Sequence, residues 1–171
     1  QLTFQDDREG ITDLNPVYYG GLQNSLRYKG FSLDFLFQFV KQQNYNALYS
    51  MGQPGRMSNT LPDVFDRWQQ PGDQTTYQGF STGANRPLYS RHVNYNQSNA
   101  MITNASYIRL KNIAFSYTLP DRLLPKLNCR LTVQGQNLLT ITKYKGFDPE
   151  SSFSNSVPPL QIFTTGVQLN F

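Results

Sequence analysis

Apolar and polar residues alternate most regularly over the last eleven positions of the chain, Q-I-F-T-T-G-V-Q-L-N-F. One face of this run carries Phe163, Val167, Leu169 and Phe171 with Thr165 between them, and the other face is largely polar. A period of two is typical of a β-strand with one apolar and one polar side. A strand of this length that ends on an aromatic residue fits the closing strand of an outer-membrane β-barrel, but the pattern also fits a strand of an ordinary sandwich.

Earlier parts of the chain contain further strand-like segments, which are residues 17–28, 31–41, 105–118 and 127–137. In the second of them, apolar side chains occupy every odd position from Phe31 to Phe39. Only Lys29 and Gly30 separate the first two segments. This link has the length of a hairpin turn, and its glycine can adopt a positive φ. The sequence therefore predicts five antiparallel strands.

The connections between these strands alternate between short and long. Residues 119–126, with prolines that block strand continuation, join the third strand to the fourth, whereas 42–104 and 138–160 are long polar connections. A structureless loop as long as 42–104 is unusual in a compact soluble domain. Outer-membrane barrels combine short periplasmic turns with long extracellular loops. If the last strand ends in the periplasm, both long connections are extracellular. Residues 1–16 are then the last part of another extracellular loop, and residues 17–171 form the barrel region.

The third predicted strand does not divide cleanly into two faces. Arg109 and Lys111 alternate with the apolar residues Ile108 and Leu110. In an unbroken strand, however, they would lie on the same side as Ile113. A lysine or arginine that faces lipid at the midplane of the bilayer costs about 2–4 kcal/mol, and about 0–1 kcal/mol near an interface. The two charged residues must therefore face the lumen or lie near the outer rim. A bulge between Lys111 and Ile113 would accommodate both halves of the strand; the pattern leaves these alternatives open.

Composition favours a barrel over a soluble globule. Charged residues make up 15% of the chain and hydrophobic residues 38%, and polar uncharged residues make up the difference. A soluble domain normally has about a quarter of its residues charged. The net charge is +4, but the lysines and arginines are scattered, so nucleic acid is not an expected partner. No apolar run reaches the length of a transmembrane helix.

Residues that could support catalysis or hold a metal or cofactor are few. His92 is the only histidine and Cys129 the only cysteine, so no zinc or haem site is expected, and Cys129 is expected to pack on the apolar side of its strand. The acidic run at 6–9 lacks the ligand spacing of a calcium loop. The carboxylates Asp63, Asp66 and Asp73 are only a weak candidate for a glycosidase pair. We therefore expect no enzyme activity, no metal and no cofactor.

The long connection 42–104 is rich in aromatic residues, amides and arginines. Flat aromatic faces and planar polar groups bind sugars and peptides well. The candidate contacts with a partner or substrate are Trp68, Tyr77, Tyr89, Arg91 and Tyr95. The alternative is that these side chains pack the loop against itself.

Three segments together resemble the C-terminal end of the SusC/RagA family of TonB-dependent nutrient transporters from the Bacteroidetes outer membrane. They are N-P-V-Y-Y-G-G-L-Q-N-S-L-R-Y-K-G-F-S-L (15–33), N-A-S-Y-I-R-L-K-N-I-A-F-S-Y-T-L-P (104–120) and V-Q-G-Q-N-L-L-T-I-T-K-Y-K-G-F-D-P-E (133–150). The similarity runs from about residue 13 to residue 171. The resemblance implies an all-β, antiparallel transmembrane barrel of about 22 strands with a plugged lumen.

The same resemblance implies partners and a substrate class. A SusD-like lipoprotein would cover the barrel, the TonB complex would supply energy, outer-membrane lipid would surround the wall, and the cargo would be glycans or peptides. The plug and the TonB-contacting box lie upstream in such proteins and have no counterpart in these residues. We therefore expect the last five strands of a transporter, in which Phe163, Val167, Leu169 and Phe171 form a barrel-assembly signal.

Two further observations bear on completeness. The chain begins at Gln1 without a signal peptide, so it is expected to be a mature or partial polypeptide. Five strands leave two open edges, which a bilayer does not tolerate, so the remaining strands are expected elsewhere in a longer polypeptide. A soluble carbohydrate-binding β-sandwich is the alternative from a different class of protein.

Overall fold

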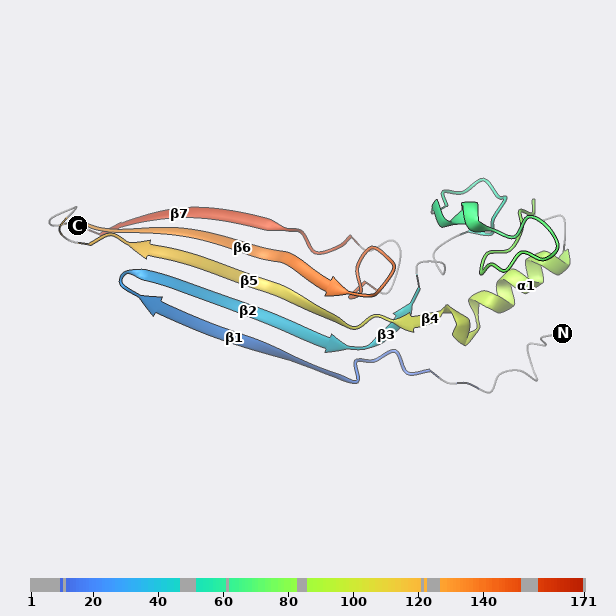
Figure 1. The fold of residues 1–171 in the computed structure, drawn as a ribbon, viewed down its shortest axis with the longest axis horizontal. Helices are drawn as coiled ribbons and strands as arrows, with labels where there is room; N and C mark the ends of the chain where they lie inside the picture. Colours follow the sequence, from blue (N-terminus) through green and yellow to red (C-terminus); the bar gives the residue numbers. More distant parts are fainter. Residues whose placement is uncertain are drawn as a thin grey trace.

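The main element of the computed structural model is one five-stranded antiparallel sheet (Figure 1). The structure describes residues 10, 12–46, 52–60, 62–82, 86–120, 122, 127–151 and 157–170. The sheet has the order β1-β2-β5-β6-β7, formed by β1 (Tyr18–Tyr28), β2 (Phe31–Lys41), β5 (Tyr107–Thr118), β6 (Asn128–Thr142) and β7 (Ile162–Asn170). The prediction of five antiparallel strands in an all-β chain is confirmed.

The turn between β1 and β2 has the geometry that its sequence predicts. Lys29 has a φ of 45° and Gly30 a φ of 86°, which is the pair of positive values found in tight type I′ hairpin turns. A Cβ atom on Gly30 would lie 2.8 Å from the carbonyl oxygen of Thr118 on β5. Glycine is therefore required here both by backbone conformation and by the close approach of the neighbouring strand.

One face of the sheet is apolar across all five strands. Because directly opposed residues of antiparallel strands point to the same side, Leu26, Leu33, Phe115 and Val133 form one continuous row. The full apolar face consists of Leu22, Leu26, Tyr28, Phe31, Leu33, Phe35, Phe37, Phe39, Ile108, Leu110, Ile113, Phe115, Tyr117, Leu131, Val133, Leu139, Ile141, Phe163, Val167 and Leu169. Many of these side chains are exposed, since no described element covers them. This is the pattern of a barrel wall that faces lipid.

The opposite face is largely polar, as expected for a barrel lumen, although it also carries Tyr19, Leu36, Val40, Tyr107 and Ile162. It carries Gln23, Ser25, Arg27, Ser32, Asp34, Gln38, Arg109, Asn112, Ser116, Arg130, Thr132, Gln134, Gln136, Thr164 and Gln168. Ser25 on β1 hydrogen-bonds to the carboxylate of Asp34, its direct partner on β2. Cys129 is a free cysteine on the apolar side, opposite Leu169, and is 7% exposed, in line with the expected packing role.

A bulge at Lys111 settles how the third predicted strand is arranged. The pairing of β5 with both neighbours shifts register between Leu110 and Asn112. Before the bulge, the even-numbered residues Ile108 and Leu110 lie on the apolar face. After it, the odd-numbered residues do so, beginning with Ile113. The bulge lies one position before the predicted interval. It leaves Arg109 on the polar face.

The fourth strand is longer than predicted, because β6 continues to Thr142 instead of ending at residue 137. Asn137 has a φ of 53°, and together with Leu138 it stands opposite the bulge at Lys111 on β5. The side chain of Leu138 folds back over Gly135, where a Cβ would collide with it. In the sequence, this irregularity looks like the end of a strand. The strand nevertheless continues, and Leu139 and Ile141 lie on the apolar face again.

The segment 42–104 contains ordered elements, so the prediction of a structureless loop was wrong. Strand β3 (Gln43–Tyr45) pairs with β4 (Ile102–Asn104) and prolongs the β2–β5 hairpin, with the 3-10 helix η3 (Asn99–Met101) just before β4. Beyond this neck lie the 3-10 helix η2 (Pro62–Asp66) and the helix α1 (Arg86–Asn96). Helix α1 has no acidic residue in its first turn and no buried residue, so it lacks the apolar stripe that identifies a helix in sequence.

The described helices include none that is both long and apolar enough to cross a membrane.

Short and long connections lie at opposite ends of the sheet (Figure 1). The β1–β2 turn and the end of β7 lie at one end, and α1, β3 and β4 lie at the other, which is called the loop end below. At the turn end, the rings of Phe31 and Tyr117 stack with centroids 4.3 Å apart on the apolar face. Aromatic residues at such a position are typical of the interfacial girdle of a membrane barrel.

Candidate binding site at the loop end of the sheet

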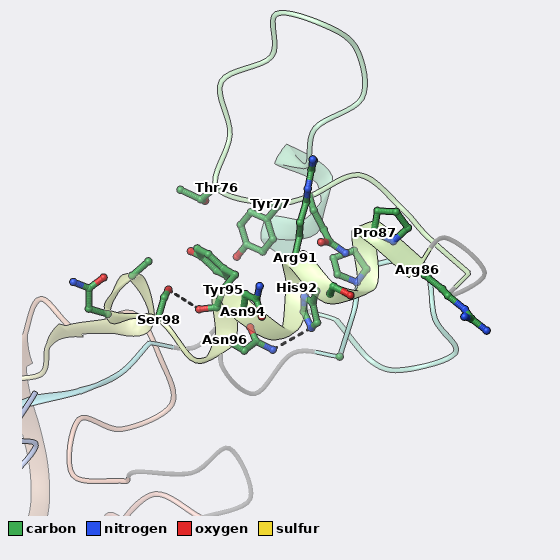
Figure 2. Close-up of a pocket in the computed structure, with 16 residues that line it drawn as sticks. Thr76, Tyr77, Arg86, Pro87, Arg91, His92, Asn94, Tyr95, Asn96 and Ser98 are labelled. Atoms are coloured by element: carbon green, nitrogen blue, oxygen red, sulfur yellow. Dashed lines mark hydrogen bonds between the residues drawn. The ribbon is translucent and has the colours of Figure 1, made fainter. Parts of the chain in front are cut away.

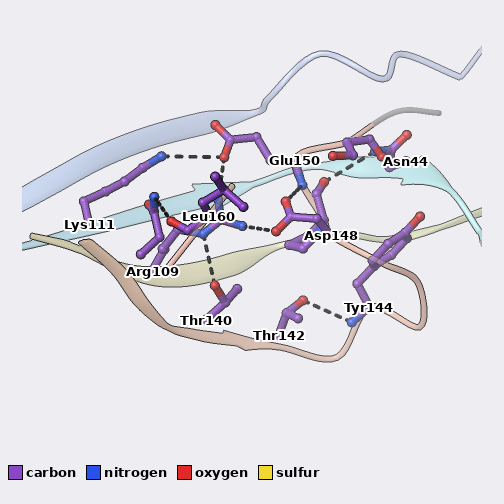
Figure 3. A network of polar contacts seen from close by, with 12 residues as sticks. Asn44, Arg109, Lys111, Thr140, Thr142, Tyr144, Asp148, Glu150 and Leu160 are labelled. Atoms are coloured by element: carbon purple, nitrogen blue, oxygen red, sulfur yellow. Dashed lines mark hydrogen bonds and ion pairs between the residues drawn. The ribbon is translucent and has the colours of Figure 1, made fainter. Parts of the chain in front are cut away.

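A buried arginine organises the loop end. Arg109 is 1% exposed, and its Nη2 lies 2.6 Å from Asp148 Oδ2 and its Nη1 2.7 Å from Glu150 Oε2. Its Nε donates a hydrogen bond of 3.0 Å to Thr140 Oγ1 (Figure 3). Lys111 Nζ lies 3.6 Å from the same Glu150 oxygen. These five residues form the Arg109 clasp, in which two cations balance two carboxylates.

Separate hydrogen bonds join the β6–β7 connection to the neck of the long loop, formed by β3 and β4. Gln42 Nε2 donates to the carbonyl oxygen of Pro149 at 2.6 Å, and Asn44 Nδ2 donates to that of Ser151 at 3.3 Å. From the other side, the hydroxyl of Tyr144 donates to the carbonyl oxygen of Tyr45 at 2.7 Å. Burial, and then the nearby Asp148 carboxylate, raise the pKa of Tyr144, so its hydroxyl stays protonated as this bond requires.

The partners of Arg109 could not be predicted from its own strand, and Asp148 and Glu150 stand out in the sequence only as part of the motif 133–150. One signal was available, because a charged side chain in the middle of a strand needs a counter-charge when it is buried. The carboxylates lie 39 and 41 positions further along the chain. Only the return of the β6–β7 connection over the polar face brings them into contact with the arginine.

A second feature of the loop end is a cleft along α1 with a volume of about 1260 Å³ (Figure 2). One wall is the helix itself, and the others come from segments before and after it. The lining residues are Gly52, Pro54, Thr76, Tyr77, Gln78, Arg86, Pro87, Ser90, Arg91, His92, Asn94, Tyr95, Asn96, Ser98, Asn99 and Ala100.

The cleft brings together three of the five predicted contact residues, Tyr77, Arg91 and Tyr95. The other two do not line it. The backbone N–H of Trp68 donates to the carbonyl oxygen of Tyr77 at 2.9 Å, and its ring packs beside Gly79. Tyr89 has the guanidinium carbon of Arg56 5.3 Å from its ring centroid. Trp68 and Tyr89 are 43% and 44% exposed, so a contact of either residue with a partner or substrate stays a prediction.

Sequence reasoning missed Arg86 and His92 as lining residues of the cleft. Arg91 and Tyr95 are four positions apart, as are His92 and Asn96, so each pair lies on one side of a helix. This spacing has meaning only once 86–96 is known to be helical. Asn96 Nδ2 and His92 Nε2 are 3.1 Å apart, which fixes the orientation of the histidine ring.

Two titratable rings of the cleft, those of His92 and Tyr77, are held in their neutral forms. Burial lowers the pKa of His92, and the charge of Arg56 lowers it further. Burial and the carboxylate of Asp63, whose Oδ2 is 3.4 Å from the hydroxyl, raise the pKa of Tyr77 to about 12. At neutral pH the charged groups in the lining are therefore Arg86 and Arg91. Within the part of the chain that the structure describes, no three His, Cys, Asp or Glu residues cluster in a way that would hold a metal ion.

The predicted barrel-assembly residues lie on the last strand of the sheet. Phe163, Val167 and Leu169 project from the apolar face of β7 and are 71%, 66% and 47% exposed. Phe171 lies outside the described residues. Within the described sheet, β7 pairs only with β6, so its other edge is open.

Comparisons with known proteins agree with this architecture. No family model matches the chain. TonB-dependent receptor P3 from Formosa agariphila is 32% identical to it over 186 aligned positions, which cover 96% of this chain and 17% of that receptor. A structure of the RagAB peptide importer in the closed-closed state matches with a TM-score of 0.70 and 27% identity over 92% of this chain and 18% of that one. The open-open state matches with a TM-score of 0.68 and 26% identity.

The chain thus spans less than a fifth of the length of these relatives. Its sheet accounts for part of a barrel wall, with one apolar and one polar face. The predicted family resemblance is confirmed by sequence and by fold. In sequence and fold the chain therefore matches part of a SusC/RagA-type TonB-dependent receptor, and its five strands form a partial barrel.

Proposed function

We propose that the chain is the C-terminal barrel segment of a TonB-dependent active transporter that imports glycans or peptides across the outer membrane with a SusD-like lipoprotein. The main support is its similarity to the RagAB peptide importer over 92% of the chain. The continuous apolar face supports a position in the membrane, where a wall of this kind needs no covering layer. The loop end, with its cleft and clasp, would then face the outside.

A soluble carbohydrate-binding sandwich is not supported by the arrangement of the sheet. Two sheets of a sandwich pack with their apolar faces together, about 10 Å apart. The described residues form a single large sheet whose apolar side chains, such as Val133 at 52% and Val167 at 66%, remain exposed. We therefore keep the transporter as the proposed function.

Replacing residues 46–101 by an Asn-Gly turn in the full-length protein tests the role of the long loop. Tyr45 and Ile102 are direct partners at the end of the β3–β4 ribbon, so a two-residue turn closes this hairpin without distorting the barrel. We expect normal amounts of folded protein in the outer membrane, loss of co-purifying lipoprotein and loss of growth on the imported nutrient. A strain that lacks the whole gene provides the baseline. Unchanged co-purification together with unchanged uptake contradicts the proposed role.

Deleting Phe171 tests the proposed assembly signal. An aromatic side chain at the end of an apolar strand face offers the assembly machinery a hydrophobic anchor, so its loss is expected to reduce the folded protein in the outer membrane several-fold. Heat-modifiable migration on gels and surface labelling report the folded fraction. Phe147→Ala, at a 69% exposed loop aromatic, serves as the control and should have no effect. Equal levels in the deletion and control strains argue against the signal.

A further inference from the structure

Cations at the loop end differ in whether they have a partner. Arg109 is paired with two carboxylates, Arg67 Cζ lies 3.8 Å from the ring centroid of Phe80, and Arg56 lies over Tyr89. Arg86 and Arg91 line the cleft, and among the described residues neither has a carboxylate partner or an aromatic ring beneath it. These two guanidinium groups are therefore the ones available to an incoming ligand.

The surroundings of the two arginines raise the positive potential further. The described lining contains no aspartate or glutamate. The first turn of α1, where Arg86 stands, has no acidic residue to offset the partial positive charge of the helix N-terminus. Arg56 adds a third positive charge close enough to act on His92. Asp63 is not part of the lining, but its carboxylate lies 3.4 Å from the hydroxyl of Tyr77, so an anion is favoured beside the arginines rather than throughout the cleft.

The remaining lining suits an oligomeric ligand. The cleft, at about 1260 Å³, is larger than the 300–1,000 Å³ typical of sites for small molecules. Tyr95 from α1 and Tyr77 from the segment before it add two aromatic rings to the lining (Figure 2). Aromatic rings bind the faces of sugar rings and of peptide units, and guanidinium groups bind carboxylates in bidentate fashion.

We infer that the cleft along α1 binds the carboxylate groups of an anionic oligomeric ligand through Arg86 and Arg91. This inference rests on the import function proposed above and specifies the chemical class of its cargo. Acidic peptides and acidic oligosaccharides share this chemistry, and the planar fork of arginine recognises both.

The test uses the full-length protein, purified from outer membranes in detergent, and four probes. Two are peptides with blocked ends, Glu-Ser-Glu-Ser and its neutral counterpart Gln-Ser-Gln-Ser. The other two are a tetragalacturonate and its methyl ester. Calorimetry at low salt is expected to show at least about tenfold tighter binding of one acidic probe than of its neutral counterpart, and the preference should shrink as salt rises. Which acidic probe shows the preference identifies the source of the carboxylate.

Variants of the protein test whether Arg86 and Arg91 cause the preference for the acidic probe. The double substitution Arg86→Gln/Arg91→Gln is expected to abolish the preference for the acidic probe and to leave the affinity for the neutral one unchanged. Arg67→Gln, in the same loop but outside the cleft, is the matched control and should keep the preference. A preference that survives the double substitution overturns the inference.

Two other outcomes separate this inference from the proposed function. Equal binding of acidic and neutral probes by the unaltered protein overturns the inference and leaves import standing, because a neutral cargo is then recognised. Absence of binding for all four probes also overturns it, and nutrient uptake by the strain with the 46–101 replacement then decides on import independently.

Discussion

Arg109→Met is expected to release the β6–β7 connection from the polar face of the sheet. The substitution removes the cation but leaves the side chain of Asp148, 8% exposed, buried without its partner. Breaking a buried ion pair in this way costs about 3–5 kcal/mol. Hydrogen exchange of the full-length protein, read by mass spectrometry on peptides that cover 143–151, should accelerate at least about 100-fold, since each 1.4 kcal/mol corresponds to about a factor of ten.

Two further variants make this first expectation specific. Arg130→Met removes an exposed arginine from the same polar face and should leave the exchange of 143–151 unchanged. Arg109→Met/Asp148→Leu removes both charges and should recover much of the lost protection, because replacing a buried pair by apolar groups is often neutral. Equal exchange in Arg109→Met and in the unaltered protein contradicts a fastening role of the clasp.

Val133→Arg is expected to prevent most of the protein from reaching its folded state in the outer membrane. Val133 lies on the apolar face, is 52% exposed and stands near the middle of β6. An arginine that faces lipid at this depth costs about 2–4 kcal/mol. The amount of heat-modifiable, surface-accessible protein should therefore fall strongly.

The neighbouring residue supplies the matched control for this second expectation. Thr132 precedes Val133 on the same strand and points to the polar face, opposite Ser116 and Gly166. Thr132→Arg adds the same charge at nearly the same depth but on the lumen side, where it remains hydrated, so folded levels should stay near normal. If both variants assemble equally well, the apolar face does not meet lipid.

The strands could be predicted from sequence wherever a single strand carries its own alternation. This is the case for β2 and β7, whose odd positions are apolar throughout or nearly so. The end of β6 could not be predicted, because the backbone irregularity at Asn137 is compensated by the bulge on β5, which is a property of two paired strands. Helix α1 was missed for a different reason, since it buries no side chain and therefore shows no apolar period.

The residues of the candidate site also differ in whether a local sequence pattern reveals them. Composition selected five residues of the long loop, of which Tyr77, Arg91 and Tyr95 line the cleft, and their contact with a ligand stays a prediction. Arg86 and His92 required knowledge of the helix, and the partners of Arg109 required knowledge of how the chain returns. Contacts between positions about forty residues apart in a single sequence have no local signature.

The bulge at Lys111 makes β5 and its neighbours β2 and β6 one exchangeable unit. On β5, even-numbered residues lie on the apolar face before the bulge and odd-numbered residues after it. On β6, the two residues Asn137 and Leu138 accommodate this change. A chimaera joined in the loop 119–127 would pair a β5 that has the parity change with a foreign β6 that lacks the matching residues. Half of the interface would then slip by one position and turn its apolar side chains toward the lumen. Because β5 also shifts register against β2, grafts between relatives should move β2 together with β5 and β6, with the crossover points placed in 29–30 and 157–161.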